Sequence, residues 1–332
     1  MIVSRTPFRI TLGGGGTDLP SYYENHGGFI FSFTLSKYMY VCLNRPSVDE
    51  LIRLKYSKSE SVESVNDLKH EIARACLDRV GISSKIEIAS LSDIPAGSGL
   101  GSSSTYTVGL LNALYSLRGD YKSLEFLANE ACIIEMDILK KPMGKQDQYL
   151  AAIGGFVRLD IDKKGNVTTN KIFVEKSIQN ELNRNLLIFF TGQQRKNNKI
   201  LNEQDKSTRK SDKEVLESLH YIKESGYQIL DIVQSGKIDD LGLMFRDHWE
   251  MKKKLSSGVT NDKINSIYKT ALDNGALGGK ISGAGGGGFF TFYCNKNHDV
   301  LRSAMASKGL RELDYSFDFD GSKIISNHRW KK

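Results

Sequence analysis

The stretch Ile94–Gly109, with the sequence IPAGSGLGSSSTYTVG, places three glycines directly before a helical pattern. A plain turn is one interpretation, because glycine adopts positive φ at low steric cost. The other is an anion site, since a glycine loop that leads into a helix aims unpaired N–H groups and the positive end of the helix dipole at one point. Two familiar phosphate motifs do not fit. Ser102 follows Gly101 where a P-loop needs lysine, and a dinucleotide fingerprint needs its third glycine one position later.

Length and composition describe an ordinary globular chain. Its 332 residues favour two domains, and 39% are hydrophobic and 26% charged. The four cysteines are scattered without a CxxC pair, which argues against zinc sites and disulfide frameworks. The opening MIVSRTPFRITL does not resemble a signal peptide, and no apolar run has the length of a membrane span. We therefore expect a cytoplasmic protein without a membrane partner.

The net charge of +7 suits either nucleic acid or phosphorylated small molecules. Zinc-finger spacing, an RNP aromatic motif and a basic arm are all missing from the sequence, so no nucleic-acid partner is expected. The densest basic run, Lys252–Lys254, is interpreted as a solvated helix face.

Hydrophobic patterns alternate between strands and helices along the chain. The fresh apolar run LLIFF (Leu186–Phe190) predicts a central strand of a second domain, so the chain is divided into residues 1–180 and 181–332. A final helix and strand are expected to close the chain. Other strands are predicted at 2–12, 29–43, 85–89, within 154–175 and on both sides of the glycine loop in 278–293, and helices at 68–80, 102–117, 124–139, up to about 255 and at 262–274.

Two further glycine stretches accompany the first one. They are RTPFRITLGGGGTDLPSYY (Arg5–Tyr23) and GGKISGAGGGGFF (Gly278–Phe290). Together with PAGSGLGSSST (Pro95–Thr105), they resemble in order the three motifs of the GHMP kinases, the superfamily of galactokinase, homoserine kinase, mevalonate kinase and phosphomevalonate kinase. The resemblance implies an α+β two-domain fold, with an N-terminal nucleotide-binding domain like ribosomal protein S5 and a C-terminal ferredoxin-like domain.

Other segments narrow the resemblance. TDLP after the glycines, GKQDQY (Gly144–Tyr149) and TGQQRKNNKIL (Thr191–Leu201) are similar to the bacterial sugar-1-kinases that act on D-glycero-D-manno-heptose 7-phosphate. This implies ATP-dependent phosphorylation of the anomeric hydroxyl to the 1,7-bisphosphate, for nucleotide-heptose and surface polysaccharide synthesis. An L-fucose-type or other sugar-1-kinase remains an alternative, as does a non-catalytic regulator that binds nucleotide and sugar. A homodimer is also expected.

The resemblance assigns two catalytic residues. Asp147 stands where galactokinase-like members carry the general base, and Arg9 stands where they carry the arginine that pairs with it. On spacing alone, Asp147 is a helix cap and Arg9 a surface residue at a strand end. Arg9 and the nearby Lys145 are expected to keep the carboxylate ionised.

The same resemblance assigns the ATP and Mg²⁺ sites. Magnesium takes hard oxygen ligands; Ser103 is the first choice with Ser102 as its alternative, and Glu135 is the second ligand with Glu130 as the fallback. The adenine pocket is expected between Ser57 and Asn66. The residues expected to bind the nucleotide phosphates are Pro95, Gly97, Ser98, Gly99, Leu100, Gly101, Ser102, Ser103 and Ser104.

Substrate-binding residues come from the first and third motifs and from one arginine. Asp18 stands where galactokinase-like members hold sugar hydroxyls. Gly15 and Gly16 replace a Glu-His pair of the galactokinase signature, which weakens galactose as the substrate. Arg195 is assigned to the distal phosphate, since arginine binds phosphate in bidentate fashion. The remaining expected substrate residues are Thr17, Lys280, Gly285 and Gly286.

Overall fold

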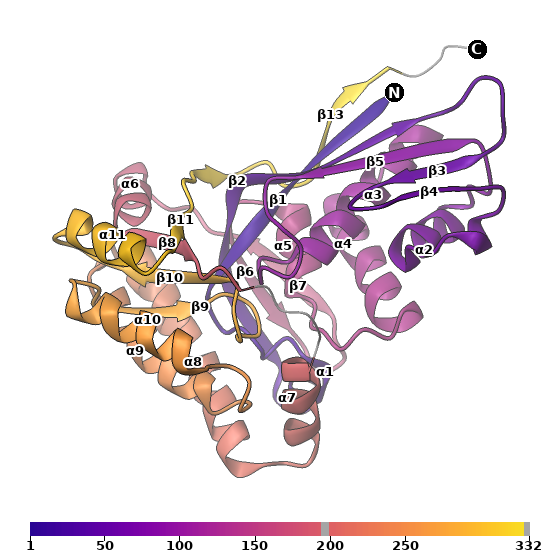
Figure 1. Cartoon of the computed structure of the whole chain (residues 1–332). Helices are drawn as coiled ribbons and strands as arrows, with labels where there is room; N and C mark the ends of the chain where they lie inside the picture. Colours follow the sequence, from indigo (N-terminus) through magenta and orange to yellow (C-terminus); the bar gives the residue numbers. More distant parts are fainter. Residues whose placement is uncertain (194–198, 329–332) are drawn as a thin grey trace.

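The computed structural model describes residues 1–193 and 199–328, which form two β-sheets with helices packed around them (Figure 1). The strands are β1 (Ile2–Gly13), β2 (Gly28–Asn44), β3 (Ile52–Lys55), β4 (Ser59–Val62), β5 (Ile86–Ser92), β6 (Phe156–Ile161), β7 (Val167–Lys171), β8 (Leu186–Phe190), β9 (Gly278–Ile281), β10 (Phe289–Tyr293), β11 (Arg311–Glu312), β12 (Phe317–Asp318) and β13 (Lys323–Asn327). The helices are α1 (Pro20–His26), the 3-10 turn η1 (Val65–Asp67), α2 (Glu71–Val80), α3 (Ser102–Arg118), α4 (Leu124–Cys132), the π-helix η2 (Ile133–Ile138), α5 (Gln146–Ile153), α6 (Lys176–Asn185), α7 (Lys199–Arg209), α8 (Lys213–Ser235), α9 (Asp240–Lys253), α10 (Asp262–Asp273) and α11 (His298–Ser307).

The first sheet is built around β1 and β2, which pair antiparallel. In the described part of the chain its main strand order is β13-β1-β2-β5-β3-β4, with β12 and β6 also paired to β2, and β7 to β6. Residues 6–10 of β1 are buried in succession although neighbouring side chains point to opposite faces. Both faces of β1 are therefore covered, and the helices that contact it are α3, α5 and α8.

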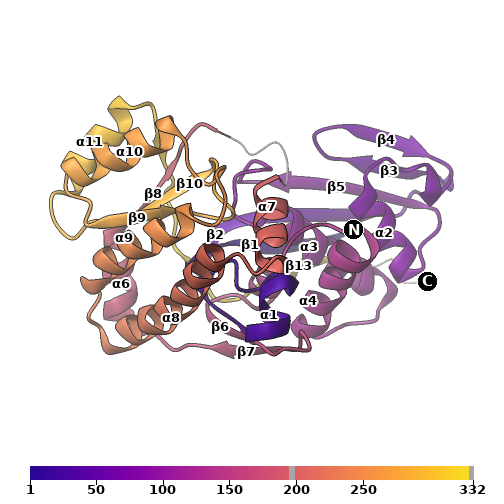
Figure 2. The ribbon, with the colours of Figure 1, turned by 90° about the horizontal axis from the view of Figure 1, so that it is seen from below.

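The second sheet contains the strand expected from LLIFF. Among the described residues its order is β11-β8-β10-β9, and all neighbours are antiparallel. Every residue of β10 is buried, and α9 packs against β9. Figure 2 shows the strands β8–β10 on one side of the molecule and β3–β5 on the other, with α1 and α7 in contact between them.

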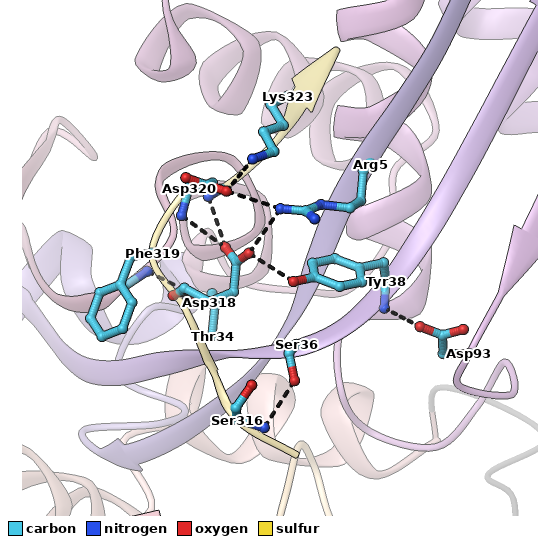
Figure 3. A network of polar contacts seen from close by, with 12 residues as sticks. Arg5, Thr34, Ser36, Tyr38, Asp93, Ser316, Asp318, Phe319, Asp320 and Lys323 are labelled. Carbon is cyan, nitrogen blue, oxygen red and sulfur yellow. Dashed lines mark hydrogen bonds and ion pairs between the residues drawn. The ribbon is translucent and has the colours of Figure 1, made fainter. Parts of the chain in front are cut away.

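The end of the chain returns to the first sheet, where β12 pairs with β2 and β13 with β1. Asp318 anchors this segment from inside a polar network (Figure 3): its carboxylate accepts the backbone N–H groups of Asp320 and Gly321 at 3.1 and 2.9 Å, and the hydroxyl of Tyr38 at 3.1 Å. Arg5 spans the pair, at 3.5 Å from Asp318 and 2.9 Å from Asp320. Residues 317–327 thus lie in the N-terminal sheet, while the division at residue 180 stays a prediction.

Most predicted elements are confirmed, with two differences. The helix expected over 124–139 changes after Cys132 into the π-helix η2, which sequence periodicity does not reveal. The single strand expected at the end is three short strands, β11, β12 and β13. Among the described residues no helix is long and apolar enough to cross a membrane.

Candidate active site

A cavity of about 390 Å³ brings the three glycine stretches together. Residues from β1 of the first sheet and from β9 of the second sheet form parts of its walls, so residues far apart in the sequence meet there. The lining residues from the motifs are Arg9, Thr11, Gly15, Gly16 and Asp18 from the first, Gly97, Gly99 and Gly101 to Ser104 from the second, and Lys280 to Ala284 from the third. Leu19 also comes from the first motif, and the others are Lys141 to Gly144, Gln146, Asp147, Leu201, Gln204, His248, Lys252 and Leu255.

The second glycine stretch forms a loop that ends in the N-terminus of α3. Gly97, Gly99 and Gly101 all have positive φ, between 74° and 84°, and no side chain caps the helix. First-turn N–H groups and the helix dipole therefore remain available for an anion at this end of the cavity. Three of the expected phosphate residues do not line the cavity: Pro95 is exposed, and Ser98 and Leu100 are buried.

The second and third stretches pack backbone against backbone. A Cβ on Gly99 would lie 2.7 Å from the carbonyl oxygen of Ser282, and a Cβ on Gly283 would lie 2.7 Å from that of Gly99. Both glycines also have positive φ, so neither position accepts a larger residue without strain. This contact fixes the third motif beside the expected phosphate loop.

Arg9 and Asp147 meet at the cavity wall. Nε of Arg9 donates to Oδ1 of Asp147 at 2.8 Å, and NH1 donates to the carbonyl of Gly99 at 2.8 Å. Arg9 is only 3% exposed, so it is positioned by this pair and by the loop. Lys145 forms no ion pair with Asp147 among the described contacts; its Nζ donates to the carbonyl of Gly165 instead.

Asp18 is buried at the cavity edge and is held by the turn that precedes α5. Its carboxylate accepts the backbone N–H of Gln146 at 3.0 Å, the side-chain amide of Gln146 at 3.1 Å and the N–H of Gly16 at 3.1 Å. Burial raises the pKa of Asp18 above its ordinary value, while the N–H bonds lower it. Thr17 faces inward, where its hydroxyl contacts the carbonyls of Gly14 and Phe29, and it does not line the cavity.

Ser103 and Glu135, the two expected metal ligands, are in contact, but only Ser103 lines the cavity. The hydroxyl of Ser103 donates to Oε1 of Glu135, while Ser104 and Gln148 donate to Oε2 at 2.7 and 2.9 Å. Glu135 is fully buried behind Ser103, and burial raises its pKa against the lowering effect of both serine hydroxyls. The fallback Glu130 is placed elsewhere, in an ion pair with Arg79 at 2.6 Å.

One wall of the cavity is basic, and we call it the basic wall. His248 and Lys252 come from α9, and Lys280 from β9. Lys280 is 5% exposed and donates to the carbonyl of Leu12; burial and the charge of Lys252 hold its pKa well below the ordinary value. The interpretation of Lys252 as part of a solvated helix face is wrong, because its Nζ donates to the carbonyl of Ile281 at 2.6 Å inside the fold.

Two further expected substrate residues lie away from the cavity. A Cβ on Gly285 would meet Val259 at 2.8 Å, and one on Gly286 would meet Ile200 at 2.7 Å, so both glycines serve close packing behind the loop. Neither lines the cavity. Arg195 lies outside the described residues, and its assignment stays a prediction.

Sequence reasoning missed several residues at the site. Gln146 donates its backbone N–H to Asp18, and its side-chain oxygen accepts the hydroxyl of Thr11 at 2.7 Å. Gln148 donates its side-chain amide to Glu135. Both glutamines flank Asp147, so their place beside the expected base was the available signal. His248 carried no local signal, because only tertiary packing turns that face of α9 toward the cavity.

Comparison with known proteins identifies the relatives of this chain. Residues 66–155 match the N-terminal domain of the GHMP kinases, and residues 229–309 match the C-terminal one. The D-glycero-alpha-D-manno-heptose 7-phosphate kinase of Campylobacter jejuni is 32% identical over 97% of this chain and 98% of its own length. The L-fucokinase/L-fucose-1-P guanylyltransferase of Bacteroides fragilis is 26% identical over 87% of this chain, which spans 34% of that longer protein.

A solved structure agrees at the level of the fold. The crystal structure of a D-glycero-D-manno-heptose 1-phosphate kinase from Bacteroides thetaiotaomicron superposes with a TM-score of 0.82, covering 99% of this chain and 100% of that one at 24% identity. The α+β two-domain fold expected from the motifs is therefore confirmed. With both family domains matched and a full-length relative above 30% identity, the chain belongs to the GHMP kinases, a family of ATP-dependent phosphotransferases.

Proposed function

We propose that this kinase phosphorylates D-glycero-D-manno-heptose 7-phosphate at its anomeric hydroxyl, with ATP and Mg²⁺, to give the 1,7-bisphosphate. The observation that carries the proposal is the Arg9–Asp147 pair beside an uncapped helix N-terminus in one cavity. The full-length relative from Campylobacter jejuni supports the choice of sugar. Such a product would feed nucleotide-activated heptose and surface polysaccharide synthesis.

Asp147 and Arg9 perform the transfer in this proposal. Oδ2 of Asp147 accepts the proton of the anomeric hydroxyl, while Oδ1 stays bonded to Arg9. The guanidinium of Arg9 stabilises the charge that develops on the moving phosphoryl group. Because phosphoryl transfer asks the protein mainly for positioning and charge, a fixed pair beside the phosphate loop suffices for the chemistry.

Ser103 and Glu135 form the proposed Mg²⁺ site. A hydroxyl and a carboxylate are the hard oxygen donors that Mg²⁺ prefers, and the remaining positions are commonly taken by water and substrate phosphates. When bound there, the ion would neutralise charge on the phosphate oxygens. Buried Gln148 keeps the Glu135 carboxylate in place.

In this proposal Asp18 binds the hydroxyl groups of the sugar, and the basic wall binds its anionic group. Asp18 accepts hydrogen bonds from sugar hydroxyls, and Gly15 and Gly16 leave room beside it because they carry no side chains. Lys280 is buried beside Lys252, and its described hydrogen-bond acceptor is a carbonyl group, so an anionic substrate in the cavity would favour its charged form. Arg195 remains the predicted ligand of the distal phosphate.

The experiment measures ADP release over a panel of sugars with and without the distal phosphate. D-glycero-D-manno-heptose 7-phosphate should give the highest kcat/KM, and removal of its phosphate should raise KM for the sugar while KM for ATP stays constant. Higher kcat/KM with L-fucose would favour the alternative, to which the Bacteroides fragilis relative points. ATP binding without turnover of any sugar would favour the non-catalytic regulator.

A further inference from the structure

His248 is a buried histidine on the basic wall, and the proposed function gives it no role. It is 2% exposed, it lines the cavity, and it lies on α9 one turn before Lys252. Helix α8 packs against α9 (Figure 1). It contributes Ser225, whose hydroxyl contacts His248. Within the described residues, the imidazole ring of His248 contacts the hydroxyl of Ser225 through Nδ1.

The hydrogen bonds of Ser225 decide which nitrogen of His248 carries the proton. The hydroxyl of Ser225 donates its single proton to the carbonyl of Ile222 at 3.0 Å. We assign that proton to Ile222 because this is the shorter of the two contacts, so toward Nδ1 of His248, 3.3 Å away, the hydroxyl accepts. Nδ1 of His248 carries a proton, and in the neutral ring Nε2 is then a bare acceptor.

The charges around His248 keep the ring neutral. Burial, followed by the charges of Lys280 on β9 and Lys252 on α9, lowers its pKa well below 6.5. The carboxylates of the cavity, Asp18 and Asp147, are already bonded to Gln146 and Arg9. At neutral pH the wall consequently presents one hydrogen-bond acceptor in the neighbourhood of Lys280 and Lys252.

When a substrate fills the cavity and displaces its water, a bare acceptor on the wall needs a donor from that substrate. A phosphate group at neutral pH offers mainly acceptor oxygens, whereas each hydroxyl of a sugar offers a proton. We infer that His248 is a specificity-determining residue that accepts, at Nε2, a hydrogen bond from one hydroxyl group of the sugar. The inference rests on the proposed function and adds to it one residue that distinguishes sugars by the position of a hydroxyl.

The test uses sugar phosphates in which one secondary hydroxyl at a time is replaced by fluorine, which keeps the size but cannot donate. For the wild-type kinase, the analogue fluorinated at the hydroxyl that contacts His248 should show a kcat/KM about tenfold lower than the parent, because Nε2 then stays unpaired. In His248→Leu the same analogue and the parent should be used equally well. In His248→Gln, whose amide oxygen is an acceptor, part of the discrimination should return.

Controls separate specificity from folding. His220→Leu removes an exposed histidine that contacts Tyr22 outside the cavity, and it should keep the wild-type ratios. His248→Met replaces His248→Leu if the latter does not unfold cooperatively. The inference is overturned if the ratio of analogue to parent in the non-accepting variant equals that of wild type at every position, as it would if Nε2 only accepted from Lys280. If wild type phosphorylates no sugar phosphate at all, the proposed function itself has failed.

Discussion

Arg9 and Asp147 form a two-point contact: NH2 of Arg9 lies 2.6 Å from Oδ1 of Asp147, and Nε donates to the same oxygen at 2.8 Å. The third nitrogen, NH1, holds the carbonyl of Gly99. One guanidinium thus ties the candidate base to the loop expected to hold the ATP phosphates. Arginine is suited to this arrangement because its donors are fixed in one plane.

The first prediction concerns this pair. Asp147→Asn should lower kcat by roughly 10²–10⁴-fold, since the amide cannot take a proton from the attacking hydroxyl. Arg9→Lys should lower kcat by at least about tenfold, because a single ammonium group cannot hold Asp147 and the loop together. Steady-state kinetics measure both, and binding of a fluorescent ATP analogue to Asp147→Asn should stay near the wild-type value. Near-normal kcat in Asp147→Asn would contradict its role.

The second prediction separates two neighbouring serines. Ser103→Ala should raise the Mg²⁺ concentration needed for half-maximal activity by about tenfold, because it removes a proposed ligand. Ser104→Ala is the matched control: Ser104 is fully buried and also donates to Glu135, so its loss should lower the free energy of unfolding by about 1 kcal/mol. Mg²⁺ titrations and urea unfolding are the two measurements. Equal Mg²⁺ requirements in the two variants would argue against Ser103 as a ligand.

The third prediction tests the place of Asp18 through its neighbour Gly144. A Cβ at Gly144 would lie 2.0 Å from Oδ2 of Asp18 and 2.7 Å from its carbonyl oxygen. Gly144→Ala must therefore displace Asp18, and KM for the sugar phosphate should rise by about tenfold or more. KM for ATP is the internal control and should change little. A variant that folds and keeps its KM for the sugar would show that Asp18 does not bind the sugar.

The fourth prediction concerns the C-terminal segment in Figure 3. Asp318→Ala removes a 4%-exposed carboxylate that holds Tyr38 and two backbone N–H groups, so the free energy of unfolding should fall by about 2–4 kcal/mol. Asp320→Ala, at an exposed position of the same network, should cost about 1 kcal/mol or less. Urea unfolding measures both. Similar losses in the two variants would show that burial does not decide the strength of this network.

Local sequence patterns predicted much of the fold. Runs rich in β-branched and aromatic residues placed β1 and β2, and apolar residues at helical spacing placed α2, with Gly81 as its stop, and α3. These signals act within a few residues. The resemblance of the motifs added pairs such as Ser103 and Glu135, which lie far apart in sequence but close together in the structure. The π-helix η2 was missed, since a change of one residue per turn leaves the apolar pattern nearly intact.

The burial of the basic wall could not be predicted from the sequence. Lys252 stands in a run of three lysines, a pattern typical of a solvated face, yet the packing of α9 against β9 turns it toward the carbonyl of Ile281. His248 shares that face for the same reason. Which side of a helix is buried depends on partners from elsewhere in the chain, and a window of local residues does not contain them.

The central claim is that this chain phosphorylates the anomeric hydroxyl of a heptose 7-phosphate. Phosphorus NMR tests it most directly, on the full chain incubated with ATP, Mg²⁺ and D-glycero-D-manno-heptose 7-phosphate. The account predicts a second sugar phosphate signal coupled to the anomeric proton, formed in equal amount with ADP and lost in Asp147→Asn. ADP formed without a new phosphate on the anomeric carbon, or a new phosphate on any other hydroxyl, would contradict it.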